Sequence, residues 1–224
     1  MTAPAVRRIE AVAKTLLSTY GSPPAAERRP LLDVLIETVL SQNTSDRNSH
    51  RAYRALRRRF PRWELVLASP RRSVAAAIAS GGLANIKAAR IKALLSGFRR
   101  RFGRPTLEPL RHLPAEDAYR YLLSLAGVGP KTAACTLLFG RGTPIFPVDT
   151  HIARISQRLG WAEPGETPAA FQERFRRLVP DRLVYSLHIN LIAHGRAVCH
   201  PRGPACPGCC IRRYCQWQKG ESDS

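Results

Sequence analysis

The feature that most constrains the fold is a short cysteine-rich segment near the end of the sequence. Five of the six cysteines lie between Cys199 and Cys215. Four of them follow the spacing C-x6-C-x2-C-x5-C, and these are Cys199, Cys206, Cys209 and Cys215. Four thiolates in one short loop can bind a [4Fe–4S] cluster or a single Zn²⁺, and the spacing alone does not choose between the two. The segment therefore predicts a metal site, with Cys210 as a spare thiol and Cys135 as a buried core residue.

The net charge narrows the class of binding partner. Lysine and arginine total 36 against 16 acidic residues, which gives a formal charge of +20 and a pI of about 11.0. So large an excess indicates a polyanionic partner, most commonly nucleic acid, because counterion release drives such binding. An anionic membrane is the alternative, but the sequence contains no apolar run near the length of a bilayer span. We therefore expect a nucleic-acid partner and no membrane.

The first twenty residues contain charges where an export signal would be apolar, and they predict a helix instead. We expect a reducing, cytoplasmic location, which agrees with cysteines gathered for metal rather than for disulfides.

Apolar spacing predicts helices along nearly the whole chain. Ile9, Val12, Ala13 and Leu16 give the first segment one core-facing side. Ser69 and Pro70 indicate a cap and a first-turn proline at the start of a helix over 71–79. Further helices are expected at 30–40, 46–60, 85–102, 114–125, from the turn at 129 to about 140, from 149 to 159, from 167, and over 182–194. Alternation typical of strands is hard to find, so the fold class is all-α.

Gly127-Val128-Gly129 predicts a sharp turn between two helices. Glycines at this spacing let a flat partner approach, and the amides at the start of the second helix favour an anion such as a DNA phosphate. Taken alone, the turn is weak evidence for such a site, because a plain helix–helix corner explains it somewhat better.

The residues around this turn carry a family resemblance. Leu125-x-Gly-Val-Gly-x-Lys-Thr-Ala133, followed by Val148-Asp-Thr-His151, resembles the helix-hairpin-helix and Gly/Pro…Asp signature of the endonuclease III family of DNA glycosylases. The resemblance implies that Gly127 and Gly129 hold backbone phosphates, with Val128 packed between them. Two positions depart from the family pattern. Ala126 stands where proline is frequent, and Pro130 stands where a basic residue is frequent and removes one amide donor.

The same resemblance assigns the chemistry. Lys131 is implied to be the nucleophile that attacks the deoxyribose, and Asp149 the carboxylate that stabilises positive charge on the sugar. Relatives that only release the base lack a lysine at this position, so Lys131 implies strand cleavage as well. Each residue also has a simpler interpretation, because a lysine after a glycine turn often contacts phosphate and an aspartate before a helix often caps it. A monofunctional glycosylase, active on mismatches or uracil, and a zinc-stabilised DNA-binding module without activity are the competing hypotheses.

The family uses the C-x6-C-x2-C-x5-C spacing for a [4Fe–4S] cluster, which implies that cofactor here. It also implies a six-helix barrel over residues 25–140, with the hairpin at about 115–140, and a cluster domain formed by 1–24 and 141–224. The likeness extends from about residue 5 to 217.

A damaged base must leave the duplex before it can be excised, and other side chains fill the gap. By resemblance, Gln42 or Asn43 enters the duplex as an amide and Leu83 as an apolar wedge. His151 is implied to touch the flipped strand or the lesion pocket, or alternatively to bond locally. The expected partner is duplex DNA with a damaged base, usually an oxidised pyrimidine, or an abasic site, bound by a monomer.

Overall fold

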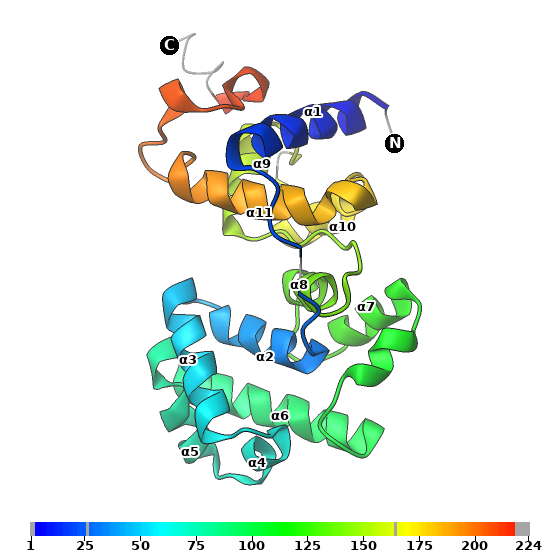
Figure 1. Ribbon diagram of the computed structural model, residues 1–224, viewed down its shortest axis with the longest axis vertical. Coiled ribbons are helices and arrows are strands. Elements are labelled where there is room, and N and C mark those ends of the chain that lie inside the picture. Colours follow the sequence, from blue (N-terminus) through cyan, green and yellow to red (C-terminus); the bar gives the residue numbers. More distant parts are fainter. Residues whose placement is uncertain (1–2, 26, 164, 218–224) are drawn as a thin grey trace. The chain divides into compact units, whose positions relative to one another are not determined.

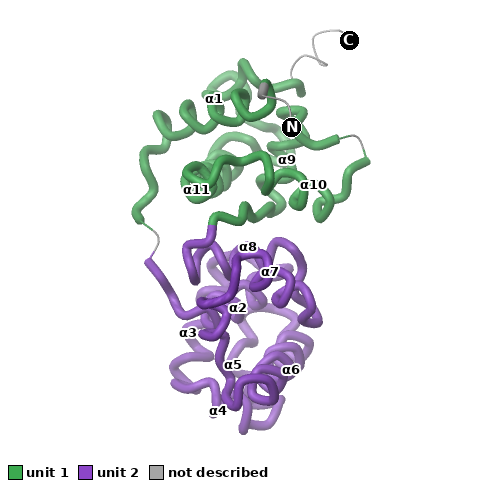
Figure 2. Tube along the Cα trace, turned by 90° about the vertical axis from the view of Figure 1, so that its right-hand side faces the viewer, with its two compact units in different colours: residues 1–26, 144–224 green, residues 27–143 purple. Residues whose placement is uncertain are grey.

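The computed structural model describes residues 3–25, 27–163 and 165–217, and the regular secondary structure among these residues is helical, with no strand. They divide into two compact units, coloured separately in Figure 2. Unit 1 takes its described residues from 1–26 and 144–224, and unit 2 is residues 27–143. No helix of the described part is both long and apolar enough to cross a membrane.

Unit 2 is assembled around two apolar helices, α2 (Leu31–Ser41) and α8 (Pro130–Arg141). Gly140 lets them approach, because a Cβ at this position would lie 2.8 Å from Leu31 Cδ2. The other elements of this unit, shown in Figure 1, are α3 (Asp46–Arg59), α4 (Trp63–Ala68), α5 (Arg71–Ala77), η1 (Ala79–Gly81), α6 (Ala84–Phe102), η2 (Glu108–His112) and α7 (Ala115–Leu123).

Unit 2 departs from the predicted helices in two places. The helix expected over 71–79 ends at Ala77 and continues as the 3-10 turn η1, and Pro70 rather than Ser69 takes the cap position. The short helix α4 was not expected, since six residues are too few to show an apolar period.

Unit 1 brings the first helix of the chain against the last part of the sequence. Its elements are α1 (Ala3–Tyr20), α9 (Thr150–Arg158), α10 (Pro168–Phe175), α11 (Asp181–Ala197), η3 (Cys206–Gly208) and η4 (Arg212–Tyr214). α1 and α9 both pack on α11. Arg8 of α1 ties three segments together by donating to the Leu159 carbonyl at 2.8 Å and the Tyr214 carbonyl at 2.5 Å.

Candidate active site

The turn between α7 and α8 has the form that its glycines predict, but the two glycines do different work. Gly127 has a φ of +78°, a left-handed conformation that favours glycine. A Cβ on Gly127 would lie 2.3 Å from Nε of Arg90. Gly129 has an ordinary φ of −90° and no atom within 4 Å of its would-be Cβ, so its backbone is open to an approaching group. Val128 between them is buried, as expected.

The side chains of Arg90 and Gln42 form a hydrogen-bonded chain that holds the turn, and sequence reasoning missed this arrangement. Arg90 of α6 donates from Nη1 to Gln42 Oε1 at 2.6 Å. Gln42 donates in turn from Nε2 to the Gly127 carbonyl at 3.4 Å and to Thr132 Oγ1 at 3.3 Å. The amide of Gln42 is therefore engaged with the hairpin, whereas the neighbouring Asn43 is exposed.

Asn43 and Leu83 share an unusual backbone. Among the described residues they are the two non-glycine residues with positive φ, at +53° and +49°. Asn43 lies in the connection between α2 and α3, and Leu83 precedes α6. Both side chains are exposed, Leu83 by 51%. Strained conformations of this kind cluster at functional positions, because a side chain is held where the backbone alone would not place it.

A buried lysine lies behind these two residues. Lys87 of α6 is only 2% exposed, and its Nζ donates to the carbonyls of Leu40 at 2.7 Å and Gly81 at 2.8 Å. These carbonyls come three and two residues before Asn43 and Leu83. Burial lowers the pKa of Lys87 from its ordinary value of 10.5, because the ammonium has left water. We call the two exposed residues Asn43 and Leu83 the exposed tips. One side chain, that of Lys87, thus fixes the backbone just before both of them.

Lys131 occupies the first turn of α8, directly after Pro130. Its side chain is half-buried, while the following residues Thr132 to Leu138 are buried in the core of unit 2. The lysine is therefore mounted on one of the two helices that form the core of unit 2, at the end that adjoins the glycine turn. The core thus fixes its backbone relative to the hairpin, and the flexible side chain extends from there.

Asp149 begins α9 in unit 1 and caps it, since Oδ1 accepts from the Ile152 amide at 2.8 Å. Within the described residues its second oxygen, Oδ2, accepts no hydrogen bond, so capping leaves one oxygen available. The extended residues before Asp149 are fixed by two buried side chains that sequence reasoning missed. Gln172 Oε1 accepts from the Val148 amide, and His188 Nδ1 donates to the Pro147 carbonyl, each at 3.0 Å.

His151 is occupied within unit 1. Its Nδ1 accepts from Arg154 Nη2 at 3.1 Å, and a Cβ on Gly195 of α11 would lie 2.8 Å from His151 Cβ. Arg154 also donates to the carbonyls of Cys199 and Gly195, at 2.9 Å and 3.1 Å. These contacts favour the local role for His151, and a contact with the flipped strand stays a prediction.

The cysteine-rich segment is anchored by Arg158 of α9, which is 8% exposed. Arg158 Nη1 donates to Cys199 Sγ at 3.1 Å and to the His200 carbonyl at 2.8 Å, and its own carbonyl accepts from Cys215 Sγ at 3.4 Å. Burial, with a smaller effect of the neighbouring Cys210, Cys199 and Cys215, raises the pKa of Cys209 to about 11, although a hydrogen bond from the Ile211 backbone lowers it in part. Gathered thiols that resist ionisation fit a site whose thiolates need a cationic centre.

No group of three or more histidine, cysteine, aspartate or glutamate side chains in the described residues is arranged to hold one metal ion. The arrangement of the described side chains alone therefore supports neither a single-Zn²⁺ site nor a [4Fe–4S] site. A cluster at these cysteines stays a prediction, carried by the C-x6-C-x2-C-x5-C spacing. Cys135 is buried in α8, as expected of a core residue.

Comparison with known proteins defines the class to which this fold and site belong. Residues 36–181 match the family described as HhH-GPD superfamily base excision DNA repair protein. The structure superposes on a non-covalent endonuclease III–DNA complex with a TM-score of 0.82, at 23% identity and 100% coverage of both chains. A thermostable thymine-DNA glycosylase gives 0.80, at 21% identity, with 96% of this chain and 98% of that chain covered. These structural likenesses establish the helix-hairpin-helix glycosylase fold.

Sequence relatives define the family more narrowly. Endonuclease III of Thermotoga maritima is 35% identical over 83% of this chain and 83% of its own length. A candidate DNA glycosylase of Arabidopsis thaliana is 39% identical over 76% of this chain, which spans 58% of that relative. The chain belongs to the endonuclease III family, within the HhH-GPD superfamily of base excision DNA glycosylases.

Proposed function

We propose that the chain is a bifunctional DNA glycosylase and AP lyase that excises damaged bases, chiefly oxidised pyrimidines, from duplex DNA. The observation that carries the proposal is the position of Lys131, an amine on the first turn of α8 directly after an open glycine turn. A phosphate bound at that turn would bring a deoxyribose within reach of the amine. The proposed partner is duplex DNA with a damaged base or an abasic site, bound by a cytoplasmic monomer.

Lys131 supplies the nucleophile. Its neutral Nζ donates an electron pair to C1′ of the sugar, the C1′–N bond breaks, and the base leaves with a proton. Opening of the sugar ring gives a Schiff base between Nζ and C1′. Loss of a proton from C2′ then expels the 3′ phosphate by β-elimination, and hydrolysis returns the free lysine. Base release and strand cleavage thus use the same side chain.

Asp149 supplies negative charge. As the C1′–N bond breaks, positive charge builds on the sugar, and a fixed carboxylate stabilises it most strongly where water is excluded. The hydrogen bond from the Ile152 amide to Oδ1 fixes the orientation of the group, and Oδ2 is left to act. Capping and catalysis are therefore compatible roles for Asp149, and the first helps to position the second.

Asn43 and Leu83 are proposed to enter the duplex when the base leaves it. Both are exposed and both are held in a left-handed conformation by their surroundings. The engagement of Gln42 with Arg90 and the hairpin supports Asn43 as the amide that fills the gap, and gives Gln42 a bracing role.

Cys199, Cys206, Cys209 and Cys215 would hold a [4Fe–4S] cluster. Bound there, the cluster supplies a covalent staple for a segment that has little apolar core of its own. Arg158 would orient the Cys199 ligand and join the segment to α9.

Borohydride trapping tests the lysine directly, since it reduces a Schiff base to a stable adduct. The wild-type protein should form an adduct with a lesion-bearing duplex, and Lys131→Ala should form none. Lys14→Ala, which removes an exposed lysine of α1, is the matched control and should trap as well as the wild type. Base release without any adduct in the wild type would overturn the lyase and leave a monofunctional glycosylase.

Asp149→Asn tests the carboxylate without disturbing the helix, because an asparagine oxygen can still cap α9. We expect base release to slow by about 10²–10³-fold while DNA binding and melting temperature are kept. Unchanged turnover would refute the assigned role. Scoring base release and nicking separately on a panel of lesions would define the substrate range, and inertness toward all of them would favour a non-catalytic DNA-binding module.

A further inference from the structure

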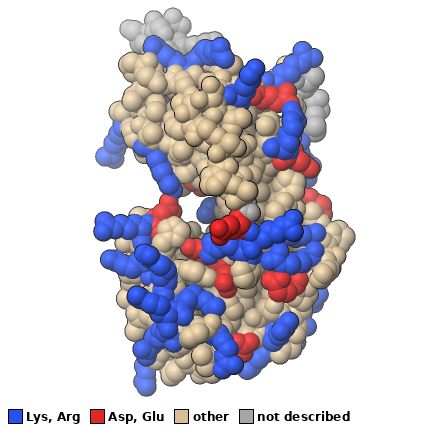
Figure 3. Space-filling model, in the orientation of Figure 1, with Lys and Arg blue, Asp and Glu red and all other residues tan. Residues whose placement is uncertain are grey.

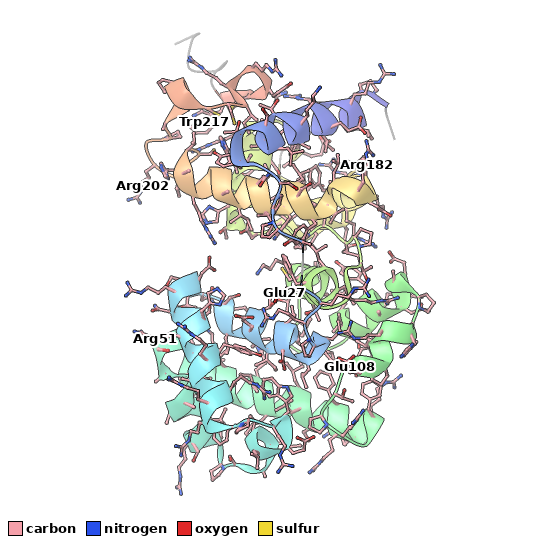
Figure 4. All side chains as sticks on the ribbon, viewed as in Figure 1. Glu27, Arg51, Glu108, Arg182, Arg202 and Trp217 are labelled. Atoms are coloured by element: carbon pink, nitrogen blue, oxygen red, sulfur yellow. The ribbon has the colours of Figure 1, made fainter. Side chains whose placement is uncertain are left out.

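The outer face of α3 carries a stripe of arginines that the proposed chemistry does not use. Arg47, Arg51, Arg54 and Arg58 are spaced by four, three and four residues, so they project from the same side of the helix. All four are exposed. The opposite side packs into unit 2 through Ser49, Ala52 and Leu56. We call these four residues the α3 stripe; Arg51 is labelled in Figure 4.

Neighbouring carboxylates do not neutralise this stripe. The carboxylate of Glu37 pairs with Arg29 Nη2 at 2.5 Å and with His50 Nδ1 at 2.7 Å. Asp33 accepts a hydrogen bond from Trp63 Nε1 at 2.8 Å. Within the described residues, no ion pair joins a member of the stripe to a carboxylate. Like charges three and four residues apart destabilise an isolated helix, so the stripe opposes folding rather than supporting it.

The surface beside the stripe is hollowed and basic. An open hollow of about 610 Å³ is lined by Arg51, Tyr53, Arg54, Arg57 and Arg58. Arg57 stacks over the Trp63 ring, with 4.4 Å from its guanidinium carbon to the ring centroid. Figure 3 shows lysine and arginine atoms gathered over this part of unit 2. The atoms that line the hollow are mostly apolar, so the phosphate contacts are assigned to the exposed guanidinium groups of the α3 stripe, which suit bidentate contact with phosphate oxygens.

The position of the stripe in the chain indicates which anion it meets. α3 starts three residues after Asn43, the amide proposed to enter the duplex. From Arg47 to Arg58 the helix rises by about 16 Å, at about 1.5 Å per residue. A duplex completes one turn in about 34–36 Å, so a straight helix of this length spans about half a turn and can contact a few phosphates of the nearer backbone without following one strand.

We infer that the α3 stripe is a second phosphate-binding track, which holds duplex DNA flanking the lesion without reading its sequence. The inference rests on the proposed function, because it takes duplex DNA as the ligand. It adds a contact surface separate from the hairpin glycines and from the residues that enter the duplex. Its effect should be on affinity and on salt dependence, because each phosphate contact releases condensed counterions.

The test compares two triple variants that remove equal charge. Arg51→Gln, Arg54→Gln and Arg58→Gln together remove most of the stripe. Arg99→Gln, Arg100→Gln and Arg104→Gln remove three exposed arginines at the far end of α6 and form the control. The dissociation constant for an undamaged 30-base-pair duplex is measured over a range of salt concentrations. The slope of log affinity against log salt should fall by about 2–3 with the stripe variant, at about 0.9 per lost contact, and by less than about 1 with the control.

Equal slopes for the two variants would overturn the inference. A loss confined to single-stranded DNA or RNA, with duplex affinity kept, would also overturn it. A matching Arg→Lys triple variant covers the case in which the glutamine variant folds poorly, because it keeps the charge and should keep the slope. Because binding is measured on undamaged DNA, a failure here is distinct from a failure of borohydride trapping, which reports the proposed enzyme.

Discussion

Replacement of Lys87 by methionine is the perturbation whose consequences the structure defines most closely. The ammonium donates two buried hydrogen bonds, to the Leu40 and Gly81 carbonyls. Hydrogen bonds from charged groups contribute about 1.5–3 kcal/mol each, and their loss leaves two buried carbonyls without a donor. Methionine also relieves the desolvation that lowers the pKa of Lys87, which offsets part of this cost. We expect a net destabilisation of about 2–3 kcal/mol, or about 5–10 °C in melting temperature.

A purely structural lysine would lower stability and nothing more. Lys87, however, fixes the chain just before Asn43 and Leu83, so its loss should loosen both exposed tips. Release of a paired damaged base needs those tips, whereas cleavage at a preformed abasic site needs them less, because no base must be unstacked. We expect Lys87→Met to slow base release from a paired lesion about 10-fold more than it slows strand cleavage at an abasic site. A difference of about 10-fold corresponds to a loss of about 1.4 kcal/mol of the free energy that holds the tips in place.

Lys92→Met is the matched control for this experiment. Lys92 also donates from α6 to several backbone carbonyls, those of Val66, Leu67 and Ser69 at the C-terminal end of α4, which lie away from Asn43 and Leu83 in sequence. It should lower the melting temperature without changing the ratio of the two rates, both measured in single turnover. If Lys87→Met and Lys92→Met change that ratio equally, Lys87 does not position the tips.

Two further outcomes follow from the contacts in unit 1. Glu166 accepts Arg174 in a two-pronged pair, at 2.9 Å and 2.7 Å, and this hydrogen bonding lowers the pKa of Glu166 from 4.5. Glu166→Gln should lower the free energy of unfolding by about 1 kcal/mol at pH 7. This difference should vanish as the pH falls below the lowered folded-state pKa, because a carboxylate with a depressed pKa stabilises the fold only while it is ionised. Denaturant unfolding at several pH values checks this, and a difference that does not depend on pH would contradict it. Cys199→Ser should lose iron and melt earlier, whereas Cys210→Ser, which alters the spare thiol, should keep the iron content of the wild type; normal iron in Cys199→Ser would refute the ligand set.

Most of the helical framework could be predicted from the sequence, because apolar spacing and caps are local signals. Asp149 and Thr167 cap their helices as the pattern predicts, accepting from the amides of Ile152 and Ala170. The resemblance to the endonuclease III family, carried by the hairpin, Asp149 and the cysteine spacing, was confirmed by the family match. Catalysis by Lys131 and Asp149 stays a prediction until it is tested.

The bracing residues could not be predicted in this way, because their partners lie far along the chain. Lys87 belongs to a segment that reads as a basic surface helix, and one of its acceptors is 47 residues away. One signal was present in the composition. Only five of the 36 basic residues are lysines, and two of them, Lys87 and Lys92, bind clusters of backbone carbonyls. Arg8 and Arg154 also donate to pairs of backbone carbonyls, so a carbonyl cluster by itself does not explain why these two positions have lysine.

Gly127 and Gly129 look equivalent in the sequence, but the structure separates what each one does. Gly127→Ala should cost more than about 1 kcal/mol, because its φ is +78° and its Cβ would meet Arg90. Gly129→Ala meets nothing within 4 Å at an ordinary φ, but Gly129 is the N-cap of α8, where alanine is less favourable than glycine. That cost offsets the gain of about 0.4–1 kcal/mol through the unfolded chain, so the melting temperature should change little. The same methyl group would stand where a phosphate must approach α8, so Gly129→Ala should weaken DNA binding without a matching loss of stability. If Gly129→Ala kept full affinity, the backbone at this turn would not be a phosphate site, because a methyl group there would obstruct no ligand.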